Sequence, residues 1–187
     1  MVLLEQKKGC VLFENRIIED NRGWFSVQIN VNELQKYDFN GIVQLNHSFT
    51  REKGIIRGFN YQSAPFQQSK IIRCVKGSIY SVGVNINPQS PEFGEWIGYG
   101  LTANDNRMML VPRIFAHGFI TLEENSEMEY FTDEVYAPQN AKSIRYDDPD
   151  IGVDWTFNGK VLPNTTILSE KNRCAGYLSN LKKEIAE

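Results

Sequence analysis

The sequence is short of residue types that several classes of protein require. Among its 187 residues there are three cysteines, an odd number without a Cys-x-x-Cys pair. This pattern is typical of reduced thiols in a cytoplasmic protein. A metal in a β-barrel would need both histidines, His47 and His117, and no third imidazole is available to complete the ligand set. We therefore expect neither a metal centre nor a cofactor.

Long apolar runs and an excess of basic residues are also missing. No apolar run approaches the roughly 18 residues of a membrane helix. The first ten residues, MVLLEQKKGC, lack a signal-peptide layout because their apolar part is short and the charges follow it. The formal net charge of −3 argues against a nucleic-acid surface, which carries clustered Lys and Arg. We expect a cytoplasmic protein without membrane insertion or nucleic-acid binding.

The stretch 54–62, GIIRGFNYQ, and the segment 70–86 that follows it organise the chain. Apolar residues recur at alternate positions in 75–86, interrupted by Gly77 and Gly83, which is typical of half-buried strands. Arg57, Asn60 and Gln62 then lie on or beside one strand, and the next strand opens after a loop that holds Pro65. Polar side chains that alternate inward along such strands line a cavity, which is our candidate site.

The rest of the chain predicts further strands and one terminal helix. Residues 9–29 read as two short strands joined by a turn at 19–23, and Asn30 with Glu33 reads as a helix cap. Residues 43–49 alternate so that Gln44, Asn46 and Ser48 face one side. Further strands are expected at 95–101, 107–111, 116–122 and 127–132. Residues 169–187 carry leucines and an isoleucine at helical spacing, which predicts a C-terminal helix outside an all-β barrel.

Short motifs along most of the chain resemble the dTDP-4-dehydrorhamnose 3,5-epimerase family of cupin-type sugar-nucleotide enzymes. The matching pieces are Asn21-Arg-Gly-Trp-Phe25, Gln44-x-Asn-x-Ser48, Arg57-Gly-x-x-Tyr-Gln62, Lys70-Ile-Ile-Arg73, Ser90-Pro-x-Phe-Gly-x-Trp96, Phe115-Ala-His-Gly-Phe119, Tyr130, Tyr136-x-Pro138, Asp147-Asp-Pro-x-Ile-Gly-Val-x-Trp155 and Leu162-Pro…Ile167-Leu-Ser169.

The resemblance implies an all-β cupin-type jelly-roll barrel with a short C-terminal helix. It also implies a homodimer that exchanges N-terminal strands. The whole chain, 1–187, is then one domain, in which residues 1–50 form the N-terminal strands and dimer arm, 51–157 the barrel core and 158–187 the tail and helix. The implied ligand is a nucleotide-linked 4-keto-6-deoxy sugar, dTDP-linked or similar, from the biosynthesis of surface polysaccharide such as lipopolysaccharide O-antigen or outer core.

The family chemistry removes a proton next to the ketone and returns one from the opposite face, which requires a base, an acid and donors for the enolate oxygen. The family places its catalytic histidine in an Arg-Gly-x-His-Tyr-Gln frame, where this chain has Asn60. A neutral amide cannot act as a general base near pH 7.

The remaining acid–base candidates come from the resemblance. Tyr130 matches the family's acid, Lys70 the lysine that faces the keto oxygen, and His117 a nearby histidine that could replace the base. Asp148 lies in the Asp-Asp-Pro segment from which the family draws the carboxylate that orients its base, so it could instead hold the amide of Asn60 or act on its own.

Six positions are expected to bind the nucleotide sugar. Arginine suits bidentate capture of a diphosphate, which favours Arg57. The others match family contacts: Gln44, Asn46, Gln62, Arg22 and Phe25, the last two from the partner subunit. Val27 stands where the family carries a glutamate, Ile114 where it carries a glycine, and Thr156 where it carries a proline.

Three interpretations follow. The chain is an isomerase that uses a non-standard base, with Tyr130 and His117 or Asp148 sharing the acid–base work. Alternatively, it is a non-catalytic cupin that binds a sugar nucleotide or serves as a partner subunit. In the third interpretation the pocket is vestigial. Asn60 and Val27 favour the second interpretation, whereas the retained Lys70, Tyr130 and Arg57 favour the first.

Overall fold

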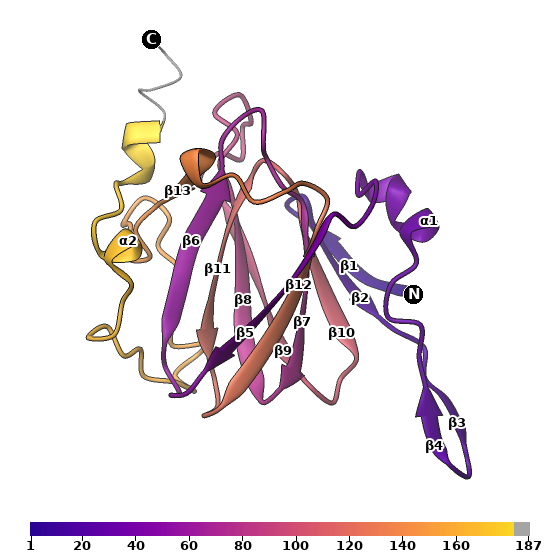
Figure 1. The fold of residues 1–187 in the computed structure, drawn as a ribbon. Coiled ribbons are helices and arrows are strands. Elements are labelled where there is room, and N and C mark those ends of the chain that lie inside the picture. The colour runs from indigo at the N-terminus through magenta and orange to yellow at the C-terminus, as the bar shows by residue number, and fades with distance from the viewer. Residues whose placement is uncertain (182–187) are drawn as a thin grey trace.

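The computed structural model describes residues 1–181, which form two facing antiparallel sheets and a projecting hairpin (Figure 1). The six-stranded sheet runs in the order β1 (Val2–Lys7), β2 (Cys10–Glu14), β10 (Arg107–Val111), β7 (Lys70–Lys76), β12 (Ser126–Thr132) and β5 (Gln44–Thr50). The five-stranded sheet runs in the order β13 (Ala141–Ser143), β6 (Ile56–Gln62), β11 (Phe115–Thr121), β8 (Ser78–Asn85) and β9 (Trp96–Thr102). The predicted all-β jelly roll is confirmed.

The space between the sheets holds one apolar cluster, and the outer face of each sheet has its own cover. Ile72, Leu101, Met109 and Phe119 are among the buried side chains that meet between the sheets. The outer face of the six-stranded sheet packs beneath α1 (Val31–Leu34), through Leu34 among others. The outer face of the five-stranded sheet is covered by side chains of the segment from residue 144 onward. Side chains that point inward are therefore enclosed by both sheets.

Several local predictions hold. Arg107–Val111 is a strand as expected, and the strands predicted near 43–49, 95–101, 116–122 and 127–132 are present within one residue at each end. Asn30 caps α1 by accepting a hydrogen bond from the backbone N–H of Asn32, and its amide also donates to Glu33 over 2.9 Å. The predicted turn lies between β3 (Ile18–Asp20) and β4 (Gly23–Phe25), the two strands of the hairpin.

One strand lies outside those predicted, and one local prediction needs correction. The strand β1 pairs antiparallel with β2 at the edge of the six-stranded sheet. The single helix expected over 169–187 is instead interrupted. After α2 (Glu170–Arg173) the chain extends and Gly176 forms a bridge with Ile144, and a helical turn begins again at Leu178. Ile185, expected on the same helical face, lies outside the described residues.

Helices and thiols complete the description. Within residues 1–181 no helix is long and apolar enough to span a membrane. The three cysteines are free, with Cys10 and Cys74 buried and Cys174 exposed.

Candidate functional site

The candidate site lies on the inner faces of the two sheets, where side chains change from apolar to polar. On β11 the inward positions are Phe115, His117 and Phe119, because the two phenylalanines belong to the cluster between the sheets and alternate residues of a strand share a face. His117 pairs with Asn60 on β6, so both side chains lie on the inner face. The polar positions of β6 therefore point into the barrel, as the alternation predicts.

Gly58 allows β6 to approach β11 closely just before Asn60. Its φ is +124°, and a Cβ there would lie 2.5 Å from Cα of Gly118 and 2.7 Å from the carbonyl oxygen of His117. Only glycine combines that backbone conformation with so little space. The register of the pair shifts at this point, between His117 and Phe119. The glycine of the Arg-Gly frame thus sets the position of Asn60 opposite His117.

Asn60 is held by a network of neutral groups from three segments. Its Oδ1 accepts hydrogen bonds from Oγ of Ser143 (2.7 Å) and from Nδ2 of Asn172 (3.2 Å). Asn172 is itself held by Ser169, whose Oγ donates to its Oδ1 over 3.0 Å. None of these four side chains titrates near neutral pH, so this network positions Asn60 without offering a proton acceptor of useful strength.

Lys70 is the buried cation of the site. It opens β7, its residue exposure is only 9%, and its Nζ donates to the backbone carbonyl oxygen of Asn60 over 3.3 Å. Within the described part of the chain no carboxylate forms a hydrogen bond or ion pair with it. Burial, and then the positive charge of Lys171, lower the pKa of Lys70 from 10.5 to about 8. The uncharged amine is therefore accessible close to physiological pH.

His117 is buried and neutral. Its Nε2 lies 2.9 Å from Oγ of Ser81, a fully buried residue of β8. Burial, and then the charge of Lys70, lower the pKa of His117 to about 3. An imidazole with so low a pKa is a weak base at neutral pH, but its neutral form still offers one N–H donor. The expectation that His117 replaces the base is therefore disfavoured on chemical grounds.

Tyr130 and Lys70 share the inner face of the six-stranded sheet. Tyr130 pairs with Ile72, and Lys70 pairs with Thr132, which makes the tyrosine and the lysine diagonal neighbours on adjacent strands. Burial first, and then the phenol of Tyr136, raise the pKa of Tyr130, while Arg57 opposes this shift. Tyr130 is thus protonated at neutral pH and can act as an acid.

The predicted binding residues of β5 and β6 form two separate sets of hydrogen bonds. Nε of Arg57 donates to Oγ1 of Thr50 and its second terminal nitrogen donates to the carbonyl oxygen of Phe49, both over 3.1 Å. Gln44 donates to Oδ1 of Asn46 over 2.5 Å. Asn46 in turn pairs with Tyr130 across the β5–β12 ladder. Arg57 is therefore bonded at the Thr50 end of β5, whereas Gln44 lies at the other end of that strand and Asn46 lies opposite Tyr130.

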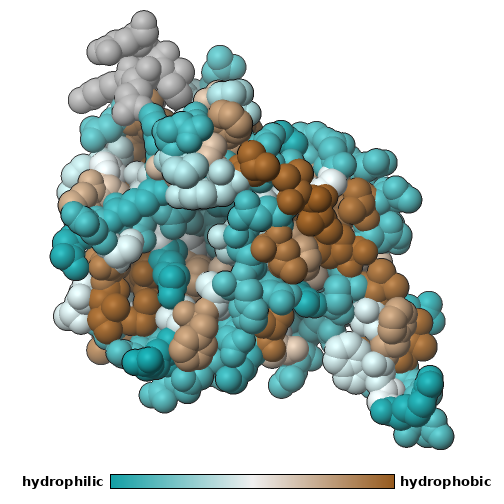
Figure 2. All heavy atoms as spheres, in the orientation of Figure 1, coloured by the Kyte–Doolittle hydropathy of each residue, from teal (hydrophilic) through white to brown (hydrophobic). Residues whose placement is uncertain are grey.

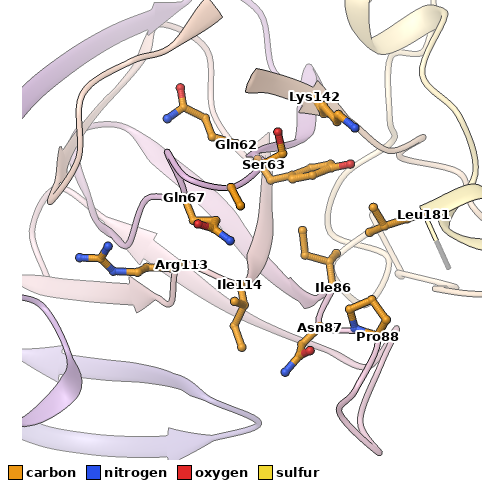
Figure 3. Close-up of a pocket in the computed structure, with 12 residues that line it drawn as sticks. Gln62, Ser63, Gln67, Ile86, Asn87, Pro88, Arg113, Ile114, Lys142 and Leu181 are labelled. Atoms are coloured by element: carbon orange, nitrogen blue, oxygen red, sulfur yellow. The ribbon is translucent and has the colours of Figure 1, made fainter. Parts of the chain in front are cut away.

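Two cavities are lined in part by residues of β6. One of about 450 Å³ is lined by Ile55, Ile56, Arg57, Asn60, Ile167, Leu168, Ser169 and Asn172. A second, of about 400 Å³, is drawn in Figure 3, where Ile86, Pro88, Ile114 and Leu181 surround it together with Arg113 and Lys142. Lys70, His117 and Tyr130 line neither of these two cavities, and Asn60 is the member of the inner site that borders the first one.

The prediction that Gln62 contacts a ligand is not supported by its hydrogen bonds. Its Nε2 donates to the carbonyl oxygens of Phe66 (2.6 Å) and Val135 (3.0 Å), and its Oε1 accepts from the N–H of Ala137 (2.7 Å). The side chain is 4% exposed. Both Nε2 and Oε1 of Gln62 are therefore hydrogen-bonded within the chain, and the side chain links two loops to β6.

Of the two alternatives for Asp148, a contact with Asn60 is not present. Asp148 is 2% exposed, and its carboxylate accepts from the backbone N–H groups of Asp150 (2.9 Å) and Leu178 (2.6 Å). It stabilises the loop and the start of the last helical turn. The side chains that contact the amide of Asn60 are Ser143 and Asn172, neither of which the sequence motifs indicated.

Arg22 and Phe25 lie on the projecting hairpin, away from the other predicted residues of the same chain (Figure 1). Arg22 pairs with Asp20 over 2.6 Å, and Phe25 is 63% exposed. Their predicted role needs a second subunit. Residues 1–181 contain no group of three or more His, Cys, Asp or Glu side chains arranged to hold a metal ion.

Replacing the buried ammonium of Lys70 is expected to stabilise the protein. The lowered pKa corresponds to about 3 kcal/mol of unfavourable free energy when the lysine is charged. Between pH 8 and 10.5 the unfolded state binds more protons, so wild-type stability rises with pH over this window. Lys70→Met should therefore raise the free energy of unfolding by about 3 kcal/mol at pH 7 and by under about 1 kcal/mol at pH 10.

Urea unfolding of both proteins at the two pH values measures this difference. Lys76→Met is the control, because Lys76 is exposed and its ion pair within residues 1–181 is with Glu127, and it should change stability by no more than about 0.5 kcal/mol. Equal stabilities of the wild type and Lys70→Met at pH 7 would contradict the assignment of an unbalanced buried charge.

Comparisons with known proteins agree with this architecture. The family model described as dTDP-4-dehydrorhamnose 3,5-epimerase matches residues 6–180. A relative of that name from Shigella flexneri is 34% identical over 181 residues, with 94% of this chain and 98% of the relative covered. The solved dTDP-6-deoxy-D-glucose-3,5-epimerase of Legionella pneumophila, in complex with dTDP-4-keto-L-rhamnose, has a TM-score of 0.87 and 30% identity over 99% of this chain and 96% of that chain.

A third solved structure is a double mutant of a 3′-monoepimerase from Streptomyces bikiniensis in complex with dTDP, in which a histidine is replaced by asparagine and a tyrosine by phenylalanine. It has a TM-score of 0.83 and 25% identity, covering 95% of this chain and 87% of that chain. The family model spans nearly the whole sequence, and the full-length relative exceeds 30% identity. The chain belongs to the dTDP-4-dehydrorhamnose 3,5-epimerase family.

Proposed function

We propose that this protein binds a dTDP-linked 4-keto-6-deoxy sugar and moves a proton at a carbon next to the ketone, without a histidine at position 60. The observation that carries the proposal is the placement of Lys70, His117 and Tyr130 on the inner faces around Asn60. A protonated phenol, a neutral imidazole N–H and a lysine suit an enolisable ketone, because they can donate to or stabilise an enolate oxygen. Family membership supports the class of substrate.

The nucleotide is expected to lie towards β5 and the start of β6. Arg57 keeps part of its guanidinium for a ligand after its contacts with Thr50 and Phe49, and its planar donors suit a diphosphate. Gln44 and Asn46 lie on the inner face of the same strand β5 whose far end Arg57 contacts. A place in surface-polysaccharide biosynthesis and a cytoplasmic location go with this proposal and remain predictions.

A second candidate function is binding without turnover. It is favoured by the neutral network around Asn60, since two amides and two hydroxyls take the place of a base. The double mutant from Streptomyces bikiniensis shows that, in one relative, a histidine-to-asparagine change is compatible with bound dTDP. Binding and turnover must therefore be measured separately.

The proposal includes a homodimer. Apolar side chains are exposed on the hairpin that carries Arg22 and Phe25, and also on the outer face of β5. Leu45 and Phe49 on the outer face of β5 are 52% and 48% exposed, and Trp24 and Phe25 on the hairpin are 60% and 63% exposed. Figure 2 shows hydrophobic side chains on this side of the molecule and at the base of the projecting hairpin. Contiguous exposed apolar surface is typical of protein interfaces.

Proton exchange at the sugar tests the proposed chemistry. Purified protein in D2O with dTDP-4-keto-6-deoxyglucose should remove the proton signal at C3 or C5, as followed by proton NMR. Tyr130→Phe should slow the appearance of an inverted sugar by about 10²-fold or more, because the acid is lost. Tyr177→Phe, whose ring packs against Arg145, is the matched control and should behave as wild type.

Calorimetric binding of dTDP separates the alternatives. Binding without exchange would support the non-catalytic interpretation and contradict proton transfer on this sugar. Absence of both would contradict the proposed function as a whole.

The oligomeric state tests the proposed dimer. Light scattering should give a mass about twice the 21.5 kDa of the chain. Leu45→Asp combined with Phe49→Asp should shift the protein towards the monomer, because charges in an apolar interface are costly. Leu162→Asp is the control, since Leu162 is 86% exposed elsewhere on the molecule. A wild-type mass of one chain would contradict the dimer.

A further inference from the structure

Lys70 lies where its amine can take part in proton transfer at the inner site. Its side chain enters the interior from the start of β7 and its Nζ reaches the backbone of Asn60, the residue in the histidine position of the family frame. Tyr130 is its diagonal neighbour on β12, and His117 faces Asn60 from β11. The amine is thus the titratable group that directly contacts residue 60.

Every other candidate for a proton acceptor in the site is chemically unsuited. His117 is hydrogen-bonded to Ser81, and burial lowers its pKa to about 3. The carboxylate of Asp148 accepts from two backbone N–H groups and does not reach Asn60. Tyr130 has a raised pKa, so its phenol donates rather than accepts at neutral pH.

The surroundings of Lys70 favour the uncharged amine. The charged and titratable groups that face it are His117 on β11, Tyr130 on β12 and Lys171 on α2, while β6 and β10 present the carbonyl of Asn60 and the side chain of Val111. Two of these neighbours, His117 and Lys171, are cations when they are protonated. Within residues 1–181 no carboxylate pairs with Lys70. Burial and like charge both favour release of its proton.

We propose that the uncharged amine of Lys70 is the proton acceptor that removes the hydrogen next to the ketone. The lone pair of Nζ takes the proton, the C–H electron pair forms the C=C bond of an enolate, and the carbonyl π pair moves to the ketone oxygen. Return of a proton from the new ammonium regenerates the starting sugar, with solvent deuterium in D2O. Return from the Tyr130 hydroxyl to the opposite face inverts the carbon. Solvent then reprotonates the phenolate and deprotonates the ammonium.

This inference rests on the proposed function, and the exchange assay in D2O separates the two. Lys70→Ala and Lys70→Arg should each lower the exchange rate by about 10²-fold or more, because arginine keeps the charge but cannot be deprotonated. Methylamine added to Lys70→Ala should partly restore exchange, and the restored rate should follow the concentration of free amine as the pH is raised.

The wild-type rate should rise with pH through a midpoint near 8, the pKa of Lys70. Lys171→Met should move this midpoint upward while leaving the maximal rate unchanged, because it removes a neighbouring positive charge. Circular dichroism and dTDP binding check that each variant is folded.

Three results would overturn the inference. Exchange by Lys70→Arg at the wild-type rate would reduce the lysine to an electrostatic role. Rescue by methylammonium rather than free methylamine would do the same. Full exchange by Lys70→Ala would remove any role, while the proposed function would survive in all three cases. Absence of wild-type exchange despite ligand binding would reject both the inference and the proposed chemistry.

Discussion

A buried ammonium without a buried carboxylate to balance it determines the electrostatics of the inner site. Lys70 is enclosed between the two sheets, and the described residues offer it a backbone carbonyl rather than an ion pair. The charge of Lys70 helps to keep His117 neutral, and the charge of Lys171 in turn lowers the pKa of Lys70. Desolvation and like charge act in the same direction here, so the site favours uncharged nitrogen bases. When Lys70 is protonated, its unbalanced positive charge suits a ligand on which negative charge develops.

The neutral network around Asn60 fits this electrostatic arrangement. Gly58 lets β6 lie against β11, and this places Asn60 between His117 and the segment that carries Asn172. An imidazole at position 60 would adjoin the amide of Asn172 rather than a carboxylate, and it would also face the charge of Lys70. Both features would lower its basicity. Positions 60 and 172 are therefore coupled, and neither can be interpreted without the other.

The sequence predicted the strands and the inward polar face well, because alternation of apolar and polar residues is a local property. It placed Gln44 and Asn46 on one face of β5, which the structure confirms. Ser81 was missed although a signal existed, since it lies two residues after Ile79 and shares its inward face.

Contacts between distant segments could not be predicted in this way. Asn172 reaches Asn60 across 112 positions of sequence, and nothing local marks it. Asp148 was assigned from its segment alone, whereas its carboxylate is used by two backbone N–H groups. The C-terminal helix was predicted too long because helical spacing of leucines does not register the bridge between Gly176 and Ile144. Tertiary pairing overrides local periodicity at that point.

The most direct measurement compares C–H exchange of the keto sugar in D2O by the wild type, Asn60→His and Asn60→His combined with Asn172→Asp. The account predicts that the single variant gains less than about 3-fold, because its new imidazole lies beside Lys70 without a carboxylate partner. The double variant should gain about 10-fold or more, because the second substitution places a carboxylate next to the imidazole and raises its basicity. A full gain from Asn60→His alone, with dTDP binding unchanged, would contradict the coupling of positions 60 and 172 and the electrostatic account of the site.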